Sequence, residues 1–279
     1  MDRTIGVLHP GEMGASLGAA AAAGGAEVVW CDDGRSDATR GRADAEGLQR
    51  VDDLRALVDA SDLIISICPP AAAVGVASAV AALGFGGLYL DANAVSPETA
   101  RDIEGVVTAG GARFIDGGVV GPPARSAGGT ILYLSGTDAG EVASAFEESV
   151  LEAQVVGERA GEASAVKMAF AAWTKGSAAL LLAVRALAEG EGVSEGLLHA
   201  WSRFGPDLDD RARATAAATG PKAWRFTGEM EEIADTFEAA GLPSGFHRAA
   251  AEIYQRMVPF KERRGGLDAV LSALLGSEA

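Results

Sequence analysis

The chain has 279 residues, of which 48% are hydrophobic and 22% charged, a balance typical of a protein that folds around a buried core. The formal net charge is −16, and the absence of a basic stripe that could neutralise phosphates argues against a nucleic-acid partner. Cys31 and Cys68 lack metal-ligand spacing, so we expect no metal site. Gly, Lys, Arg or Glu interrupts the apolar stretches, so we expect no membrane span. We expect a cytoplasmic protein.

The first half of the chain alternates short strand-like runs with alanine-rich helical segments. The expected strands are Thr4–His9, Glu27–Cys31, Asp62–Ile67, Leu88–Asp91, Arg113–Asp116 and Thr130–Ser135. The expected helices between them are Met13–Ala23, Asp52–Asp59, Ala71–Leu83 and Pro97–Ala109, the last with Ser96 as its N-cap. Such alternation predicts a doubly wound parallel sheet, whose strands are buried on both faces.

The second half of the chain has only helical patterns. We expect one long helix over Glu162–Glu189, because no turn signal stronger than Gly176 interrupts it. Shorter helices follow at Glu195–Phe204, Pro206–Ala218, Glu229–Ala240, Ser244–Met257 and Leu267–Leu275, separated by breaks rich in glycine and proline. The sequence therefore predicts an α/β domain at about 1–157 and an all-α domain at about 158–279, joined by the long helix.

The segment His9-Pro10-Gly11-Glu12-Met13-Gly14 forms the turn between the first strand and the first helix. Backbone N–H groups of such a turn, together with the positive end of the helix, can hold a pyrophosphate, which indicates a Rossmann domain. Gly11 lets the backbone approach the phosphates, and Gly14 lets the helix pack on the sheet. His9 replaces the usual first glycine. It either contacts the cofactor or closes the turn beside Pro10, and the residues favour the second role.

The residues after the second strand bear on the choice of cofactor. An acidic residue there hydrogen-bonds the ribose of NAD, whereas an arginine pairs with the 2′-phosphate of NADP. The sequence offers both, with Asp32 followed by Arg35-Ser36. A cation beside a hydroxyl suits a phosphate, so we favour NADP over NAD, with a merely solvated turn as the alternative.

Lys167 and Lys175 lie on the long helix with no acidic residue three or four positions away. Desolvation of an unpaired ammonium lowers its pKa and makes it suitable for proton transfer. The alternative is a lysine at the helix edge, with a buried stem and its charge in water. The residues alone favour neither interpretation.

The order of these motifs resembles that of the β-hydroxyacid and 6-phosphogluconate dehydrogenase superfamily and, more distantly, of the imine reductases. The chain looks most like the branch with a phosphogluconate-dehydrogenase-like C-terminal domain of unknown function. His9–Gly14 corresponds to the family's Gly-x-Gly-x-Met-Gly loop, Asp91–Pro97 to its segment beside the nicotinamide, and Asp116–Pro122 to its substrate segment. Lys167 falls on the family's catalytic lysine, which donates or accepts the proton.

The resemblance implies hydride transfer between a nicotinamide cofactor and a small carbonyl or hydroxyl substrate, in a homodimer. It implies cofactor binding by His9, Pro10, Gly11, Glu12, Met13, Gly14, Asp32, Arg35, Ser36, Cys68, Pro69 and Asn93. It implies substrate binding by Asn93, Val120, Gly121, Pro122 and Lys175.

Two departures from the family pattern bear on the substrate. Val120 stands where the family has a substrate-anchoring serine, and Ala171 stands where it has an asparagine one turn after the lysine. Their loss argues against a standard 3-hydroxy acid, because a buried carboxylate needs partners; Arg125 offers a replacement cation. Two alternatives stay open: an imine reductase or reductive aminase, against which the retained Lys167 argues, and a non-catalytic NADP(H)-binding protein.

Overall fold

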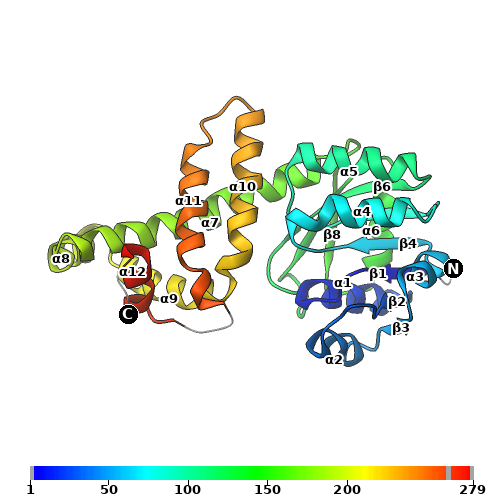
Figure 1. Cartoon of the computed structure of the whole chain (residues 1–279), viewed down its shortest axis with the longest axis horizontal. Coiled ribbons are helices and arrows are strands. Elements are labelled where there is room, and N and C mark those ends of the chain that lie inside the picture. The colour runs from blue at the N-terminus through cyan, green and yellow to red at the C-terminus, as the bar shows by residue number, and fades with distance from the viewer. Residues whose placement is uncertain (1–2, 262–264, 277–279) are drawn as a thin grey trace. The chain divides into compact units, whose positions relative to one another are not determined.

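The computed structural model describes residues 3–261 and 265–276. The chain divides into two compact units, Met1–Met168 and Ala169–Ala279, of which the first contains the sheet and the second only helices (Figure 1). The long helix α7 (Glu162–Gly190) begins in the first unit and continues into the second. The two units therefore share this helix.

An eight-stranded sheet with the order β3-β2-β1-β4-β5-β6-β7-β8 forms the first unit. Its strands are β1 (Thr4–Val7), β2 (Glu27–Cys31), β3 (Gln49–Val51), β4 (Leu63–Ser66), β5 (Leu88–Asp91), β6 (Arg113–Val120), β7 (Ile131–Ser135) and β8 (Glu152–Gly157). β1 to β6 run parallel, whereas β7 pairs antiparallel with β6 and parallel with β8. The strand order reverses between β1 and β4, where doubly wound sheets bind ligands at the carboxyl ends of their strands.

Helices cover both faces of this sheet (Figure 1). They are α1 (Glu12–Ala23), α2 (Asp37–Ala45), α3 (Leu54–Ala60), α4 (Ala73–Ala81), α5 (Pro97–Ala109), α6 (Ala139–Ala143) and the short 3-10 turns η1 (Pro70–Ala72) and η2 (Ser144–Phe146). Successive strand residues enter opposite cores. Leu63 and Ile65 pack in the core that includes α1, whereas Ile64 packs in the core that includes α3, α4 and α5. Both faces are therefore dry, which explains the continuous apolar strands.

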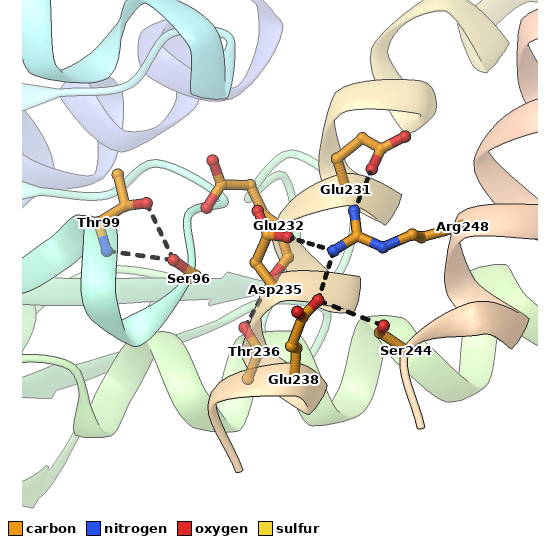
Figure 2. A network of polar contacts seen from close by, with 9 residues as sticks. All are labelled: Ser96, Thr99, Glu231, Glu232, Asp235, Thr236, Glu238, Ser244 and Arg248. Carbon is orange, nitrogen blue, oxygen red and sulfur yellow. Dashed lines mark hydrogen bonds and ion pairs between the residues drawn. The ribbon is translucent and has the colours of Figure 1, made fainter. Parts of the chain in front are cut away.

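The expected α/β architecture is confirmed, with local corrections. Glu27–Cys31, Leu88–Asp91 and Pro97–Ala109 have the predicted bounds, and Ser96 caps its helix by accepting a hydrogen bond from the Thr99 N–H (Figure 2). The predicted doubly wound sheet is mostly parallel, and its antiparallel pair is the β6–β7 hairpin. The sequence analysis also missed β3, β8 and α2, because short edge strands and polar helices have weak hydrophobic patterns.

β6 extends beyond the predicted end at Asp116 to Val120. The two residues after the predicted end are Gly117 and Gly118, and glycine usually weakens a strand. In the structure both glycines permit close contacts. A Cβ on Gly117 would lie 2.9 Å from the Asp91 carbonyl oxygen, and one on Gly118 would lie 2.6 Å from that of Ala163. The glycines therefore mark close backbone approach rather than the end of a strand.

The second unit continues from α7 into further helices. These are α8 (Ser194–Phe204), α9 (Leu208–Thr219), α10 (Ala223–Ala239), α11 (Gly245–Arg256), α12 (Leu267–Leu275) and the 3-10 turns η3 (Gly220–Lys222) and η4 (Val258–Phe260). α10 and α11 lie side by side (Figure 1).

Ion pairs connect these two neighbouring helices. Figure 2 shows Arg248 of α11 facing three carboxylates of α10, those of Glu231, Asp235 and Glu238, with N–O distances of 3.2, 3.0 and 2.6 Å. All four side chains are exposed, so water screens these ion pairs and weakens their contribution.

α7 is the one helix in the described part of the chain that is long and apolar enough to cross a membrane. Its composition alone does not distinguish a membrane span from a core helix of a water-soluble protein. In the first unit its residues Ala163 and Met168 are fully buried, and in the second unit Leu182 is fully buried. Along these turns α7 serves as a core helix.

Candidate functional site

The turn between β1 and α1 leaves the start of α1 open. Gly11 is the N-cap, and no side chain among the described residues caps this end. A Cβ on Gly11 would meet nothing within 4 Å, whereas one on Gly14 would lie 2.1 Å from the His9 carbonyl oxygen. Glu12 is the first residue of α1, followed by the half-buried Met13. The turn closes tightly at Gly14 and presents free space at Gly11, which suits a phosphate at a helix N-terminus.

His9 and Arg35 lie near one another beside this turn. Burial, and secondly the charge of Arg35, lower the pKa of His9 to about 4, so its imidazole is neutral at pH 7. The His9 Nδ1 atom has no hydrogen-bond partner among the described residues. Arg35 donates through Nη2 to the Leu8 carbonyl oxygen at 3.2 Å. The guanidinium is thereby held against the end of β1, next to the phosphate turn.

Asp32, at the end of β2, is neutralised by arginines. Its carboxylate pairs with the Nε atoms of Arg40 and Arg50 at 2.7 and 3.1 Å. Ser36 caps α2, and its hydroxyl accepts a hydrogen bond from the Thr39 N–H at 3.3 Å. The acidic residue after β2 is therefore already paired with two arginines.

Asn93 connects the loops that follow β4 and β5. Its Nδ2 donates to Asp91 Oδ2 at 2.7 Å and to Ser66 Oγ at 3.2 Å. Its Oδ1 accepts from the Cys68 N–H at 2.5 Å, and its own N–H donates to Asp91 Oδ1 at 3.1 Å. Both donors of the Asn93 amide are thus used within the protein, and the side chain is 2% exposed. The buried Asn93 side chain therefore holds the loops after β4 and β5 together at this edge of the sheet.

Cys68 and Pro69 follow β4 at the same edge. Burial, and secondly the charge of Asp91, raise the pKa of the half-buried Cys68 thiol to about 12, so the thiol stays protonated at neutral pH. Pro69 is exposed and precedes η1. Cys68 contributes its backbone N–H, rather than a reactive thiolate, to the network of Asn93.

Asp116 caps α7 from a neighbouring strand. Its Oδ2 accepts hydrogen bonds from the N–H groups of Gly161 and Ser164 at 3.0 and 2.9 Å, and its Oδ1 accepts from Ser164 Oγ at 2.6 Å. Ser135 of β7 also donates to Oδ2, at 3.0 Å. An anion at a helix N-terminus satisfies free N–H groups and interacts favourably with the helix dipole. The start of α7 is therefore attached to the sheet by a buried carboxylate.

Lys167 lies on α7 just beyond this cap. A Cβ on Gly118 would lie 3.0 Å from the Lys167 Cβ, so the helix runs directly against β6 at this position. The cap and the close approach together determine where the lysine leaves the helix. Asp116, Ser135 and Ser164 were not among the predicted site residues. The available signal was an aspartate ending an apolar strand, which Asp91 shares.

Lys175 has partners that helical spacing did not reveal. Its Nζ forms an ion pair with Glu229 of α10 and lies 4.9 Å from the centre of the Phe226 ring. Tyr254 donates to the Lys175 carbonyl oxygen at 2.8 Å. The prediction that Lys175 is unpaired is therefore wrong, because the partner comes from another helix. In the second unit this lysine belongs to a half-buried cluster.

The predicted substrate segment ends β6 and begins the loop to β7. Val120 is the last strand residue, Gly121 and Pro122 are exposed, and the Pro122 carbonyl oxygen accepts from Thr130 Oγ1 at 2.6 Å. An open cavity of about 550 Å³ lies at this loop, lined by Glu12, Arg42, Pro122, Pro123, Arg125 and Ser126. The proposed replacement cation, Arg125, pairs with Glu46.

Family comparison identifies the first unit. The NAD binding domain of 6-phosphogluconate dehydrogenase matches residues 4–155, more than half of the chain. The chain belongs to this family. Residues 188–257 match a domain of unknown function (DUF1932). The two matches confirm the resemblance drawn from the motifs, and the protein is an NAD-binding, dehydrogenase-like member of the superfamily.

Individual relatives agree with this assignment. An uncharacterized 28.5 kDa protein of Methanothermus fervidus is 33% identical over 172 residues, which span 62% of this chain and 66% of that protein, just under two thirds. A conserved hypothetical protein of Sinorhizobium meliloti is 28% identical, with a TM-score of 0.69 over 98% of this chain and 96% of that one. The 3-hydroxyisobutyrate dehydrogenase of Mycobacterium tuberculosis shares the fold at 19% identity, with a TM-score of 0.72 over 98% and 99%.

The contact between Gly118 and α7 generates a prediction about stability. Gly118→Ala places a methyl group against the Ala163 carbonyl and Lys167, so we expect a loss of about 1–3 kcal/mol in the free energy of unfolding. Gly105→Ala is the matched control, because Gly105 lies inside α5 with nothing within 4 Å of its Cβ position. That change should instead stabilise by about 0.5–1 kcal/mol. Urea denaturation measures both, and equal effects would contradict the close approach.

Proposed function

We propose that the protein is an NAD(P)-dependent oxidoreductase that transfers a hydride between a nicotinamide cofactor and a small carbonyl or hydroxyl substrate. The observation that carries the proposal is Lys167, held against β6 in the same unit as the open β1–α1 turn. Lys167 is able to donate or accept a proton, and the β1–α1 turn is able to hold a pyrophosphate. Family membership supports the nucleotide, and the capped start of α7 supports the lysine.

The residues present fit a dinucleotide. The turn residues His9, Pro10, Gly11, Glu12, Met13 and Gly14 would hold the pyrophosphate, and Asp32, Arg35 and Ser36 would face the adenine ribose. Cys68, Pro69 and Asn93 would form the edge toward the nicotinamide. The open end of α1 and the space at Gly11 are the features that fit the group. When bound, the nicotinamide supplies the hydride chemistry, while the protein orients the reactants and excludes water.

Lys167 is proposed as the catalytic residue. A lysine ammonium can donate a proton to an oxygen that gains charge on reduction, and the neutral amine can accept that proton in the reverse direction. The cap at Asp116 holds the helix that carries this lysine in place. Val120, Gly121 and Pro122 would contact the substrate beside it, and Lys175 is proposed as a further substrate-binding residue.

The chain lacks two polar side chains that bear on the class of substrate. Val120 and Ala171 provide no hydroxyl or amide, and Arg125 pairs with Glu46. A substrate without a buried carboxylate fits these residues better than a standard 3-hydroxy acid, because a desolvated carboxylate needs partners. An imine reductase or reductive aminase is the second candidate for the same reason. A non-catalytic NADP(H)-binding protein is the alternative from another class.

NADP is proposed over NAD because of the charges at the end of β2. The Asp32 carboxylate, which would accept the ribose hydroxyls of NAD, is held by Arg40 and Arg50. Arg35 lies between the end of β1 and α2 without a carboxylate partner among the described residues. Two arginines on the Asp32 carboxylate and a third cation, Arg35, at the end of β1 favour the added negative charge of a 2′-phosphate.

We propose a homodimer in the cytoplasm, and the exposed face of α7 supports the dimer. Trp173, Leu180 and Leu187 recur every seven residues on one face of this helix and are 73%, 50% and 63% exposed. Large apolar side chains in one stripe are typical of a protein interface. A second copy of the chain would cover its partner's stripe with the same residues, as a two-fold interface requires.

Replacing the lysine tests the catalytic role. Lys167→Ala should lower kcat at least about 100-fold, the usual effect of removing a general acid or base, while the Kd for NADPH changes less than about threefold. Lys222→Ala, at an exposed position of η3, is the control and should leave both unchanged. The assay follows NADPH absorbance with keto acids, aldehydes and cyclic imines. Unchanged turnover of Lys167→Ala would remove the lysine from the mechanism, and binding without turnover of any substrate would support the non-catalytic alternative.

Removing the arginine cation tests cofactor preference. Arg35→Ala should weaken NADPH binding about tenfold or more, because it removes a charge-assisted contact to the 2′-phosphate, and should change NADH binding less than about threefold. Arg55→Ala, at an exposed position of α3, is the control. Parallel fluorescence titrations measure the four dissociation constants, and equal losses for both nucleotides would argue against a 2′-phosphate contact.

Introducing charge into the stripe tests the dimer. Leu187→Glu should convert the protein to monomers, because a buried carboxylate at a two-fold interface meets its own copy. Val74→Glu, at an exposed position of α4, is the control and should leave the mass unchanged. Light scattering during size-exclusion chromatography measures the mass, and a monomeric parent protein would overturn the proposal.

A further inference from the structure

Four buried polar residues form one row across the sheet. Strand register pairs Ser66 of β4 with Asp91 of β5, Asp91 with Asp116 of β6, and Asp116 with Ser135 of β7. All four side chains are fully buried. A dry sheet rarely contains carboxylates, since each must be paired or hydrogen-bonded to avoid a large cost. The row lies at the carboxyl ends of β4 and β5 and in the middle of β6. The carboxyl ends of β4 and β5 belong to the edge to which the proposed cofactor is assigned.

The two carboxylates of the row are compensated very differently. Asp116 accepts hydrogen bonds from Ser135, Gly161 and Ser164, which together use both of its oxygens. Asp91 accepts hydrogen bonds only from Asn93 among the described residues, through the backbone N–H and the side-chain amide. Asp116 is therefore a well-satisfied structural anchor, whereas Asp91 depends on one neighbour.

This dependence also determines the orientation of the Asn93 amide. Because an ionised Asp91 accepts from Nδ2, Oδ1 must point the other way, where it accepts from the Cys68 N–H. A protonated Asp91 carries a hydroxyl that must donate, which favours a flipped amide with Oδ1 toward Asp91. A flipped amide would place Nδ2 against the Cys68 N–H, where two donors face one another. The link between the loops after β4 and β5 therefore requires a carboxylate anion.

We propose that ionised Asp91 is a positioning residue for the cofactor, acting through Asn93 to hold the loops after β4 and β5 in their binding geometry. The inference rests on the proposed function, since it assigns these loops to the nicotinamide side. Asp91 is fully buried and does not itself reach the surface. Ionised Asp91 would fix the positions of Asn93 and Cys68. These two residues would in turn determine the geometry of the cofactor site.

The protonation of Asp91 falls within the range where enzymes work. Burial raises its pKa to about 7, with the nearby Asp116 adding to the rise and the hydrogen bonds of Asn93 opposing it. The other titratable groups that face it are Cys68 after β4 and Tyr89 on β5, and burial raises the pKa of each, so both are neutral near pH 7. The positioning carboxylate is thus ionised above about pH 7 and protonated below it.

A binding measurement on the unmodified protein gives the first test. If the nucleotide binds the ionised form, affinity for NADH should fall about tenfold for each pH unit below the pKa of Asp91, and binding should release a proton near pH 6.5. NADH is the probe because it lacks the 2′-phosphate, which titrates in this range itself. Fluorescence titration from pH 6 to pH 9 gives the affinity. Calorimetry in two buffers of different ionisation enthalpy counts the protons.

Variants separate positioning from general stability. Asp91→Asn should bind NADH weakly with a flat pH profile, since its carboxamide cannot accept both Asn93 donors. Asn93→Ala should show the same flat profile, and the double variant should bind no worse than Asn93→Ala alone. Tyr89→Phe is the matched control, because it removes a buried hydroxyl on the same strand but no bond of Asn93. Its profile should keep the midpoint near pH 7.

The outcomes distinguish this inference from the proposed function. Affinity for NADH that is constant across the pH range, with no proton released, overturns the role of Asp91 while cofactor binding stands. Binding of neither NADH nor NADPH at any pH overturns the proposed function and this inference with it. Additive losses in the double variant also overturn it, because Asp91 would then act independently of Asn93. Should Asp91→Asn fail to fold by circular dichroism, the proton count on the unmodified protein decides.

Discussion

A buried carboxylate on the sheet determines where the longest helix of the protein begins. α7 has 29 residues, and Asp116 of β6 accepts hydrogen bonds from the N–H groups of Gly161 and Ser164 at its start. Ser135 of β7 takes part from the next strand, accepting from the Ala163 N–H and donating to Asp116. Because removing one partner would leave several buried polar groups unsatisfied, this attachment is stronger than any exposed ion pair. Lys167 and the continuation of α7 into the second unit both depend on it.

The functional groups are arranged around two close approaches of backbone. At Gly14 the first helix meets the carbonyl of the phosphate turn, and at Gly118 the long helix meets β6. Neither position tolerates a Cβ without displacement of main chain, which is more costly than the shift of a flexible side chain. The β1–α1 turn and the lysine are therefore parts of one packed unit rather than loops that adjust independently.

Positive side chains gather at the end of β2 although the chain as a whole is acidic. The protein carries a net charge of −16, yet Arg40 and Arg50 pair with Asp32 at the end of β2, and Arg35 is held against the end of β1. Inside the sheet the arrangement is the opposite. Asp91 and Asp116 are neighbours in register, and among the described residues their hydrogen-bond partners are amides and hydroxyls. Hydrogen bonds from amides and hydroxyls replace cations there. Arginines near the surface suit an anionic ligand. Amide and hydroxyl donors inside the sheet hold the buried carboxylates and keep this edge of the sheet rigid.

Sequence alone determined the architecture and the position of the nucleotide turn, because both follow from local rules. Apolar runs bounded by turn residues predicted β2, β5 and α5 to the residue, and glycines at fixed spacing located the β1–α1 turn. Tertiary structure alone decided the partners. Lys175 finds Glu229 on another helix, Asp32 finds Arg50 on the next strand, and Asp116 caps α7 across 45 and 48 residues of chain. Hydrogen bonds and ion pairs between distant segments leave no period in the sequence, so only the folded chain could show them.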